Sequence, residues 1–119
     1  MIEKKNEILD LSFDFALEII KLVKYLKSNK EFVMSNQILK SGTSIGANIS
    51  EAQAAQSTND FIAKMSIASK EARETEYWLR LLDKSNYLDD YQNRTVLFSS
   101  IQSIVKLLTS IIKTSQQKN

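Results

Sequence analysis

Residues 61–82, FIAKMSIASKEARETEYWLRLL, contain the pattern that decides how this chain folds. At roughly 100° per residue of helix, one apolar stripe runs along this stretch, made of Phe61, Met65, Ala68, Ala72, Leu79 and Leu82. Glu71 and Glu74 fall beside that stripe rather than opposite it. Because charged side chains are rarely buried without a partner, this border must meet a pairing group, water or a second subunit.

The composition around this stretch is typical of a helical protein. The chain has 119 residues, enough for one domain whose core needs no disulfide or metal. It contains no Pro and only two Gly, so little interrupts its helices, and we expect an all-α fold. It also contains no Cys and no His, which excludes disulfides, thiolate metal sites and the usual general base.

Apolar periodicity predicts four helices, over about residues 4–28, 33 or 35 to 55, 57–84 and 89–114, with a polar tail from about 115. Ser57 and Asp60 form the pattern of an N-terminal cap for the third helix, and Asp89 or Asp90 is expected to cap the fourth. The links are short. We therefore predict a single domain, residues 1–119, that folds as an antiparallel up-down-up-down four-helix bundle.

Two predicted helices carry features that concern packing. Gly42 and Gly46 lie inside the second helix, where each costs roughly 1 kcal/mol relative to Ala, so they indicate a close approach of another backbone or a local bend. The fourth helix has two overlapping apolar stripes, made of Leu97, Ile101, Ile104, Leu108 and Ile111 and of Phe98, Ile101, Val105, Leu108 and Ile112. This arc is wider than a small bundle needs, which favours contact with a second subunit over the alternative of a deeply buried helix.

The face of residues 57–84 opposite the core stripe is basic. Steps of three and four residues place together Lys70, Arg73, Tyr77, Arg80 and Lys84. Cations neutralise phosphates and a tyrosine ring stacks on an unpaired base, so this face is a candidate nucleic-acid-binding site. The alternative is an ordinary solvated face whose charge is reduced by Glu76 and Asp83 on its border. The net charge of +2 does not by itself indicate a nucleic-acid-binding protein.

The carboxylates do not form a known catalytic pattern. Di-iron sites in helical bundles use Glu-x-x-His from two helices, which a chain without His does not supply. We therefore expect no metal, no cofactor and no enzymatic activity. The chain has no signal-peptide pattern and no continuous apolar run of about 18 residues. These features predict a cytoplasmic protein that makes no membrane contact.

Two segments carry a family resemblance: residues 44–51, SIGANISE, and residues 68–75, ASKEARET. They resemble a bacterial family of four-helix-bundle proteins encoded in intervening sequences of 23S ribosomal RNA, also labelled S23 ribosomal protein. The accessory protein of diversity-generating retroelements, a basic pentamer that binds nucleic acid and a reverse transcriptase, is a related group. The resemblance implies a homopentamer, and it places the family's motif residues at Asn48, Glu51, Glu71 and Glu74.

The sequence thus predicts a non-enzymatic, homo-oligomeric adaptor, a pentamer by the resemblance, that binds RNA or DNA through the basic face. The alternative is an oligomeric scaffold that binds a protein partner without nucleic-acid contact. For Glu71 or Glu74 we expect pairing with a cation such as Arg73 or Lys40, or hydrogen bonding to Asn48 or a serine of the second helix. This polar network is expected either within one subunit or between two.

Overall fold

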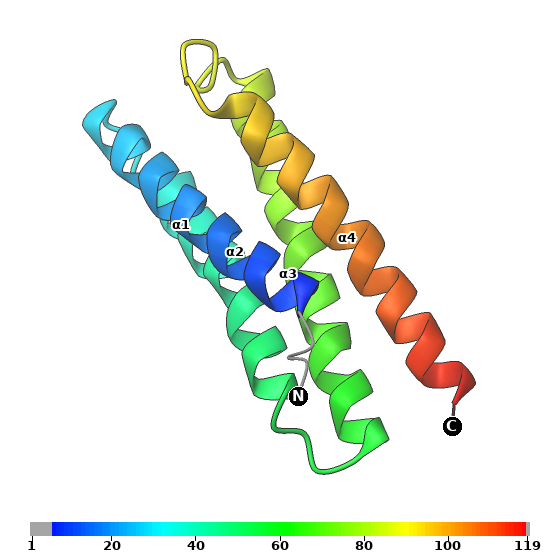
Figure 1. The fold of residues 1–119 in the computed structure, drawn as a ribbon. Helices are drawn as coiled ribbons and strands as arrows, with labels where there is room; N and C mark the ends of the chain where they lie inside the picture. The colour runs from blue at the N-terminus through cyan, green and yellow to red at the C-terminus, as the bar shows by residue number, and fades with distance from the viewer. Residues whose placement is uncertain (1–5, 119) are drawn as a thin grey trace.

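The computed structural model describes residues 6–118, and four helices account for most of them: α1 (Glu7–Ser28), α2 (Val33–Ala52), α3 (Thr58–Lys84) and α4 (Arg94–Gln117). Successive helices run in opposite directions (Figure 1). Each helix packs against the helices before and after it, and α4 returns to contact α1. Within the described residues the diagonal pairs, α1 with α3 and α2 with α4, make no close backbone approach. The predicted all-α, up-down-up-down four-helix bundle is confirmed.

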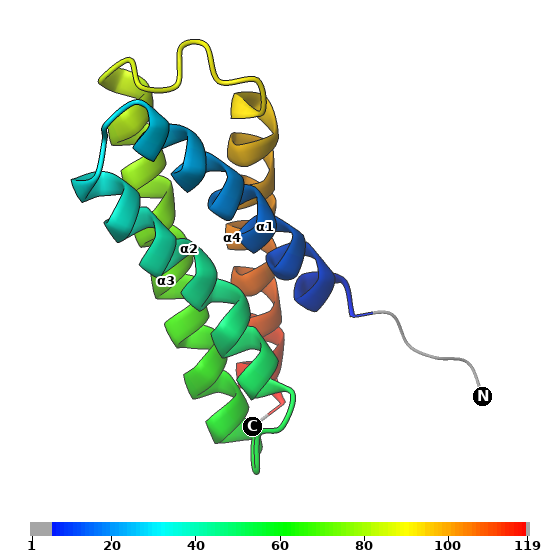
Figure 2. The same cartoon turned by 90° about the vertical axis from the view of Figure 1, so that its left-hand side faces the viewer.

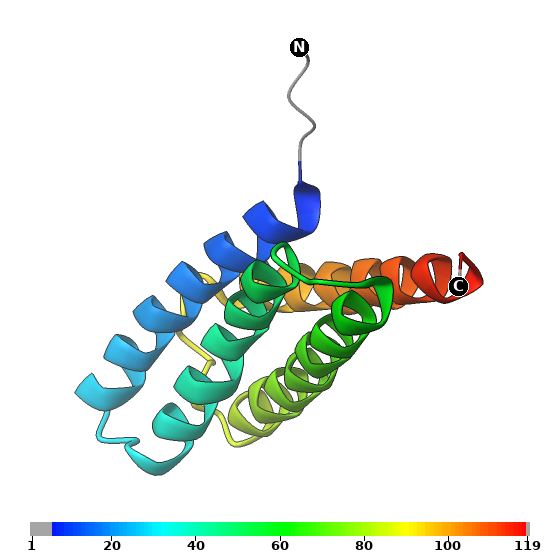
Figure 3. The same cartoon turned by 90° about the horizontal axis from the view of Figure 1, so that it is seen from below.

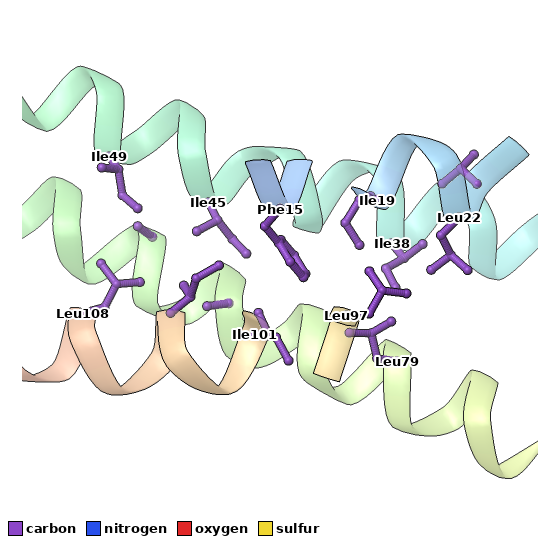
Figure 4. Packing of buried hydrophobic residues seen from close by; sticks show 14 of the residues in the cluster. Phe15, Ile19, Leu22, Ile38, Ile45, Ile49, Leu79, Leu97, Ile101 and Leu108 are labelled. Carbon is purple, nitrogen blue, oxygen red and sulfur yellow. The ribbon is translucent and has the colours of Figure 1, made fainter. Parts of the chain in front are cut away.

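The core is a column of apolar side chains to which all four helices contribute (Figure 4). Its largest fully buried members include Phe15, Ile19, Leu22, Ile38, Ile45, Ile49, Leu79 and Leu97. The stripe predicted for residues 61–82 points into this column, with Phe61 half buried at one end and its other members fully buried. Burial of apolar surface, at about 25 cal/mol per Å², therefore holds α3 in the orientation that the sequence predicts.

The ends of the helices show how a chain with two glycines makes its turns. Ser57 caps α3 as expected, since its Oγ accepts a hydrogen bond of 3.0 Å from the Asp60 N–H. Lys30 after α1 and Asn86 after α3 adopt positive φ angles of 64° and 69°. In both places the next N–H reaches back to the last turn of its helix, 2.9 Å from Glu31 N to Leu26 O and 3.0 Å from Tyr87 N to Leu82 O. These are Schellman-type ends built without glycine.

The prediction that Asp89 or Asp90 caps the fourth helix is wrong, because α4 begins at Arg94. Residues 85–93 instead fold across the end of the bundle (Figure 2). Leu88 is fully buried there, and the Tyr91 ring lies 4.7 Å from the Tyr25 ring of α1 between centroids. The segment that looked like a helix start is therefore held as a turn by tertiary packing.

Three other boundaries differ from the prediction. α2 ends at Ala52 rather than near residue 55. The backbone N–H groups of Gln53, Ala54 and Ala55 donate to carbonyls three residues back, so the chain leaves the α-helix through tighter 3₁₀-type turns. α4 continues to Gln117 instead of ending near residue 114. α1 is described from Glu7, and residues 4 and 5, where the prediction started it, lie outside the described residues.

The two glycines of α2 face α1 in different ways. A methyl group placed on Gly42 would lie 2.8 Å from Cγ1 of Ile19, a side chain that is itself fully buried. A methyl group on Gly46 would lie 3.4 Å from the oxygens of Ser12, an ordinary contact distance. At Gly42 the space is therefore taken by a buried side chain and not by the predicted backbone, whereas the atoms nearest to Gly46 include the backbone of Ser12 at an ordinary contact distance.

Among the described residues, α4 is the one helix long and apolar enough to cross a membrane by length and composition alone. A core helix of a bundle satisfies the same test, and α4 supplies Leu97, Ile101, Ile104 and Leu108 to the core. Its opposite side carries exposed polar groups, among them Gln102 and Lys106. This amphipathic pattern matches a helix that packs on a bundle.

Gly42→Ala and Gly46→Ala make a matched pair for testing the contact between α1 and α2. Both substitutions gain about 1 kcal/mol of helix propensity, but only the alanine at position 42 overpacks the core, which typically costs about 1–3 kcal/mol. We therefore expect urea denaturation to give Gly42→Ala a free energy of unfolding about 1–3 kcal/mol lower than that of Gly46→Ala, which is the cost of overpacking. Equal stabilities would show that Ile19 moves aside without cost.

Candidate nucleic-acid interface

The predicted basic face is present on α3. Its four cations and one tyrosine, Lys70, Arg73, Tyr77, Arg80 and Lys84, lie along one side of the helix, and Tyr77 at its centre is exposed. At 1.5 Å of rise per residue the row is roughly 20 Å long. Within residues 6–118 none of the four cations forms an ion pair. The structure therefore brings together the five side chains that the sequence nominated and leaves their charges free for an anion.

The tyrosine in the middle of this face contacts a second aromatic ring beside it, that of Trp78. Tyr77 is 55% exposed, and its ring and that of Trp78 pack in a T-shaped arrangement, 5.5 Å apart between centroids and with 66° between their planes. Trp78 is partly buried against the core, which fixes the ring that Tyr77 leans on. A supported and exposed ring between cations is the arrangement that stacks on an unpaired base.

Trp78 was not predicted as part of this site. Its Nε1–H is buried and has no acceptor within the described residues. The signal available in the sequence was that the only tryptophan of the chain directly follows Tyr77. Neighbours at i and i+1 on a helix usually point apart, and for that reason the pair was overlooked.

One of the two acids bordering the face is neutralised by α4. Arg94 holds Asp83 through two hydrogen bonds, 2.6 Å from Nε to Oδ1 and 2.8 Å from a terminal nitrogen to Oδ2. The same guanidinium lies 5.3 Å from the centre of the Phe98 ring. The charge of Asp83 is thus mainly neutralised by Arg94, although Lys84 of the basic face also interacts with it. Of the two acids expected to weaken the face, Glu76 is the one that remains without an ion pair in the described chain.

This contact changes the acidity of Asp83. Hydrogen bonds from Arg94, together with its positive charge and that of Lys84, lower the pKa of the Asp83 carboxyl below its ordinary value of 3.8, against a smaller opposing effect of burial. The pKa of Arg94 is raised by the same partner. Both groups are therefore charged at neutral pH. Arg94 escaped prediction because it belongs to another helix, and its nearness to Asp83 follows only from the turn between them.

The polar network expected around the motif residues does not form within the protomer. Glu71 is half buried and Glu74 is exposed, and neither side chain forms a hydrogen bond or ion pair within residues 6–118. Asn48 donates to the carbonyl of Ser44 on its own helix, at 2.9 Å. Glu51 lies 3.5 Å from Lys64 in an exposed ion pair, an arrangement worth about 0–1 kcal/mol.

The buried polar contact between α2 and α3 is made by different residues. A hydrogen bond of 2.9 Å joins Ser41 Oγ to Thr75 Oγ1, and both side chains are fully buried. Thr75 donates its own hydroxyl hydrogen to the carbonyl of Glu71, at 2.8 Å, so Ser41 is the donor of the pair. The core face of α3 thus makes its buried polar contact with α2 through two hydroxyl groups, those of Thr75 and Ser41. Glu71 and Glu74 are left at the rim, and their pairing between subunits remains a prediction.

The described residues contain no group of three or more Asp or Glu side chains placed to hold a metal ion. A hollow of about 870 Å³ lies between α1 and α2, and none of the basic-face residues lines it. Two surfaces of this structure are therefore considered for recognition, the basic face of α3 and the groove between α1 and α2.

Comparisons with known proteins agree on one family. Residues 4–110 match the family described as 23S rRNA-intervening sequence protein. A similar solved structure is that of a protein with unknown function from the S23 ribosomal protein family of Bacteroides thetaiotaomicron. The two sequences are 53% identical, the alignment covers 89% of this chain and 98% of that one, and the TM-score is 0.84. A comparison with curated proteins finds no match.

The pair of Asp83 and Arg94 predicts a pH-dependent contribution to stability. Because the pKa of Asp83 is lowered by folding, its contribution is present above pH 3.8 and is lost as the pH falls through the folded-state pKa. We expect Asp83→Asn to lower the free energy of unfolding at pH 7 and pH 5 by about 1 kcal/mol, since the pair is partly exposed, and to have little effect near pH 2.5. Urea denaturation at the three pH values measures this, with Asp90→Asn, at an exposed position in the link before α4, as control. If the difference in free energy of unfolding between wild type and Asp83→Asn is the same at all three pH values, the pairing of Asp83 with Arg94 is not its cause.

Proposed function

The chain belongs to the family of 23S rRNA-intervening sequence proteins, and on this premise we propose that it is a non-enzymatic, homo-oligomeric adaptor that binds single-stranded RNA or DNA through the basic face of α3. The observation that carries the proposal is the row of four cations around the exposed ring of Tyr77, none of which forms an ion pair with another of residues 6–118. Phosphate contacts by such cations supply affinity, and the ring supplies a stacking surface that does not depend on base identity.

A single-stranded ligand suits this face better than a duplex. The row of side chains is straight and lies on a single helix, with an aromatic ring at its centre that can stack only on an unpaired base. If all four cations contact phosphates, the logarithm of the binding constant falls with that of the salt concentration with a slope of about −3.

Apolar surface left uncovered by the protomer supports the homo-oligomer. On the outer side of α1, Phe13, Leu17 and Ile20 are 64%, 45% and 39% exposed. In α4, only 22% of the most apolar stretch is buried inside the protomer, so the wide apolar arc of this helix lies partly at the surface. Uncovered apolar patches of this kind mark interaction sites. The pentamer expected from the family resemblance is the assembly we propose, in the cytoplasm and without a membrane contact.

Assembly is tested by the mass in solution. We expect light scattering at micromolar concentration to give a mass well above the 13.6 kDa of one chain, and close to five times that value if the oligomer is a pentamer. A monomer at this concentration would contradict the oligomeric part of the proposal.

Nucleic-acid binding is tested on α3. We expect Arg73→Glu with Arg80→Glu to weaken binding of single-stranded RNA or DNA and to reduce the salt slope by about one for each phosphate that is no longer neutralised. Lys24→Glu with Lys27→Glu, two exposed positions on α1, changes the net charge equally and should bind much like wild type. If the α3 variant stays folded and binds as well as wild type, this face is not the site.

The stacking role of Tyr77 has its own test. Tyr77→Ala should weaken single-stranded binding by about 1–3 kcal/mol if a base stacks on the ring. Tyr77→Phe keeps the ring and should bind like wild type. A wild-type protein that binds neither RNA nor DNA even at low salt would instead favour the protein-binding scaffold.

A further inference from the structure

The groove between α1 and α2 has the features of a docking site for a helix. One wall is apolar and comes from α1, with Leu9, Phe13 and Ala16, and Phe13 is the most exposed large apolar side chain of that helix. The other wall comes from α2 and consists of small residues, among them Gly46, Ala47 and Ser50. Small side chains let another backbone approach closely. The hollow of about 870 Å³ is open to solvent, and no part of residues 6–118 covers it.

The rim of this groove is acidic. Asp10 and Asp14 line it, and both are exposed and without an ion pair within the described residues. No Lys or Arg occurs between Glu7 and Ile20. The groove therefore favours a partner that is apolar along one side and positively charged beside it.

The C-terminal half of α4 in this same chain has that chemistry. It presents Leu107 and Ile111, both only partly buried, and carries Lys106 and Lys113, both exposed. No Asp or Glu occurs anywhere from Arg94 to Lys118. Apolar and cationic groups thus lie side by side on α4, complementary to the apolar and acidic groups of the groove.

This half of α4 also extends past α1 in its own protomer. Asn93 Nδ2 donates a hydrogen bond of 2.9 Å to Glu18 Oε1, which places the start of α4 beside the middle of α1. The part of α1 before Glu18 is roughly 16 Å long, so residues 106–117 lie beyond its N-terminal end. Figure 1 shows this end of α4 continuing past the start of α1, and Figure 3 shows it pointing away from α1. Near its start, α4 has α1 opposite it. Along residues 106–117 the same side of α4 has no part of α1 opposite it.

We propose that the groove between α1 and α2 receives the C-terminal half of α4 from a second copy of this chain. The inference rests on the homo-oligomer of the proposed function and names its two surfaces. Leu107 and Ile111 of the incoming helix lie against the apolar wall formed by Phe13, while Lys106 and Lys113 face the acidic rim. The small residues of α2 let the incoming backbone settle close to the groove.

The contact has a consequence for the shape of the assembly. The groove and the α4 end are different parts of the chain, so the interface is heterologous, and each protomer uses both surfaces once. Repetition of a heterologous contact closes into a ring when the rotation permits. A ring of five requires this type of contact, since a contact between identical patches joins protomers only in pairs.

Charge reversal tests the contact on the full chain. The groove variant is Asp10→Lys with Asp14→Lys, the helix variant is Lys106→Glu with Lys113→Glu, and the restored variant carries all four changes. All four positions are exposed, so circular dichroism should show the same fold in each. We expect each double variant to weaken assembly at least about tenfold by sedimentation, because like charges then face each other, and the restored variant to assemble again.

The controls separate this contact from a general effect of charge. Asp89→Lys with Asp90→Lys, in the exposed link before α4, changes the net charge as the groove variant does and should leave assembly unchanged. Lys24→Glu with Lys27→Glu plays the same part for the helix variant. Phe13→Ser, at a residue 64% exposed, removes the apolar wall without opening the core and should weaken assembly at any salt concentration.

The outcomes distinguish this inference from the proposed function. If wild type assembles and both double variants assemble equally well, the oligomer stands and the two surfaces are wrong. The surfaces are also wrong if the double variants dissociate but the restored variant does not recover. A monomeric wild type would overturn the oligomer and this contact together, while nucleic-acid binding would still be judged by its own titration.

Discussion

The close contact of Ile19 with Gly42 sets the position of α1, and the other surfaces of the molecule depend on that position. With a side chain at residue 42, Ile19 would have to move from a site where it is fully buried. The contact draws α1 down onto α2 so that the stripe containing Phe15 and Ile19 reaches the core. With Phe15 and Ile19 facing the core, the helix geometry of α1 places Phe13 and Leu17 on its outer side. The exposed apolar side of α1 is thus the counterpart of its tight packing against α2.

Periodicity predicted the helices and the core well because both depend on local sequence. The stripe of α3 and the cap at Ser57 follow from spacing and from residue chemistry within one turn. The start of α4 was mispredicted because Leu88 and Tyr91 hold residues 85–93 as a turn across the end of the bundle. This packing involves residues of other helices, such as Tyr25 of α1. No local pattern distinguishes an aspartate that caps a helix from one in such a turn.

The candidate site shows the same division. The five residues of the basic face share one helix, so their placement could be predicted from spacing alone. The pairing of Asp83 with Arg94 could not, and neither could the lack of a partner for Glu71 and Glu74 within residues 6–118. Each depends on which helix packs beside α3 and on the level along α3 at which its side chains lie. The groove between α1 and α2 was likewise missed, because a hollow between two helices depends on how closely they pack and not on the spacing within either one.

The two recognition surfaces are compatible because they belong to diagonal helices. α1 and α3 lie across the bundle from each other, and the basic face points away from the core. A subunit seated in the groove would therefore leave Tyr77 and its cations open. Each added subunit would then contribute one more basic face, and several weak sites on one particle raise the overall affinity for a long strand by effective concentration. A chain whose net charge is only +2 gains most from such repetition, since a single face offers four phosphate contacts at most.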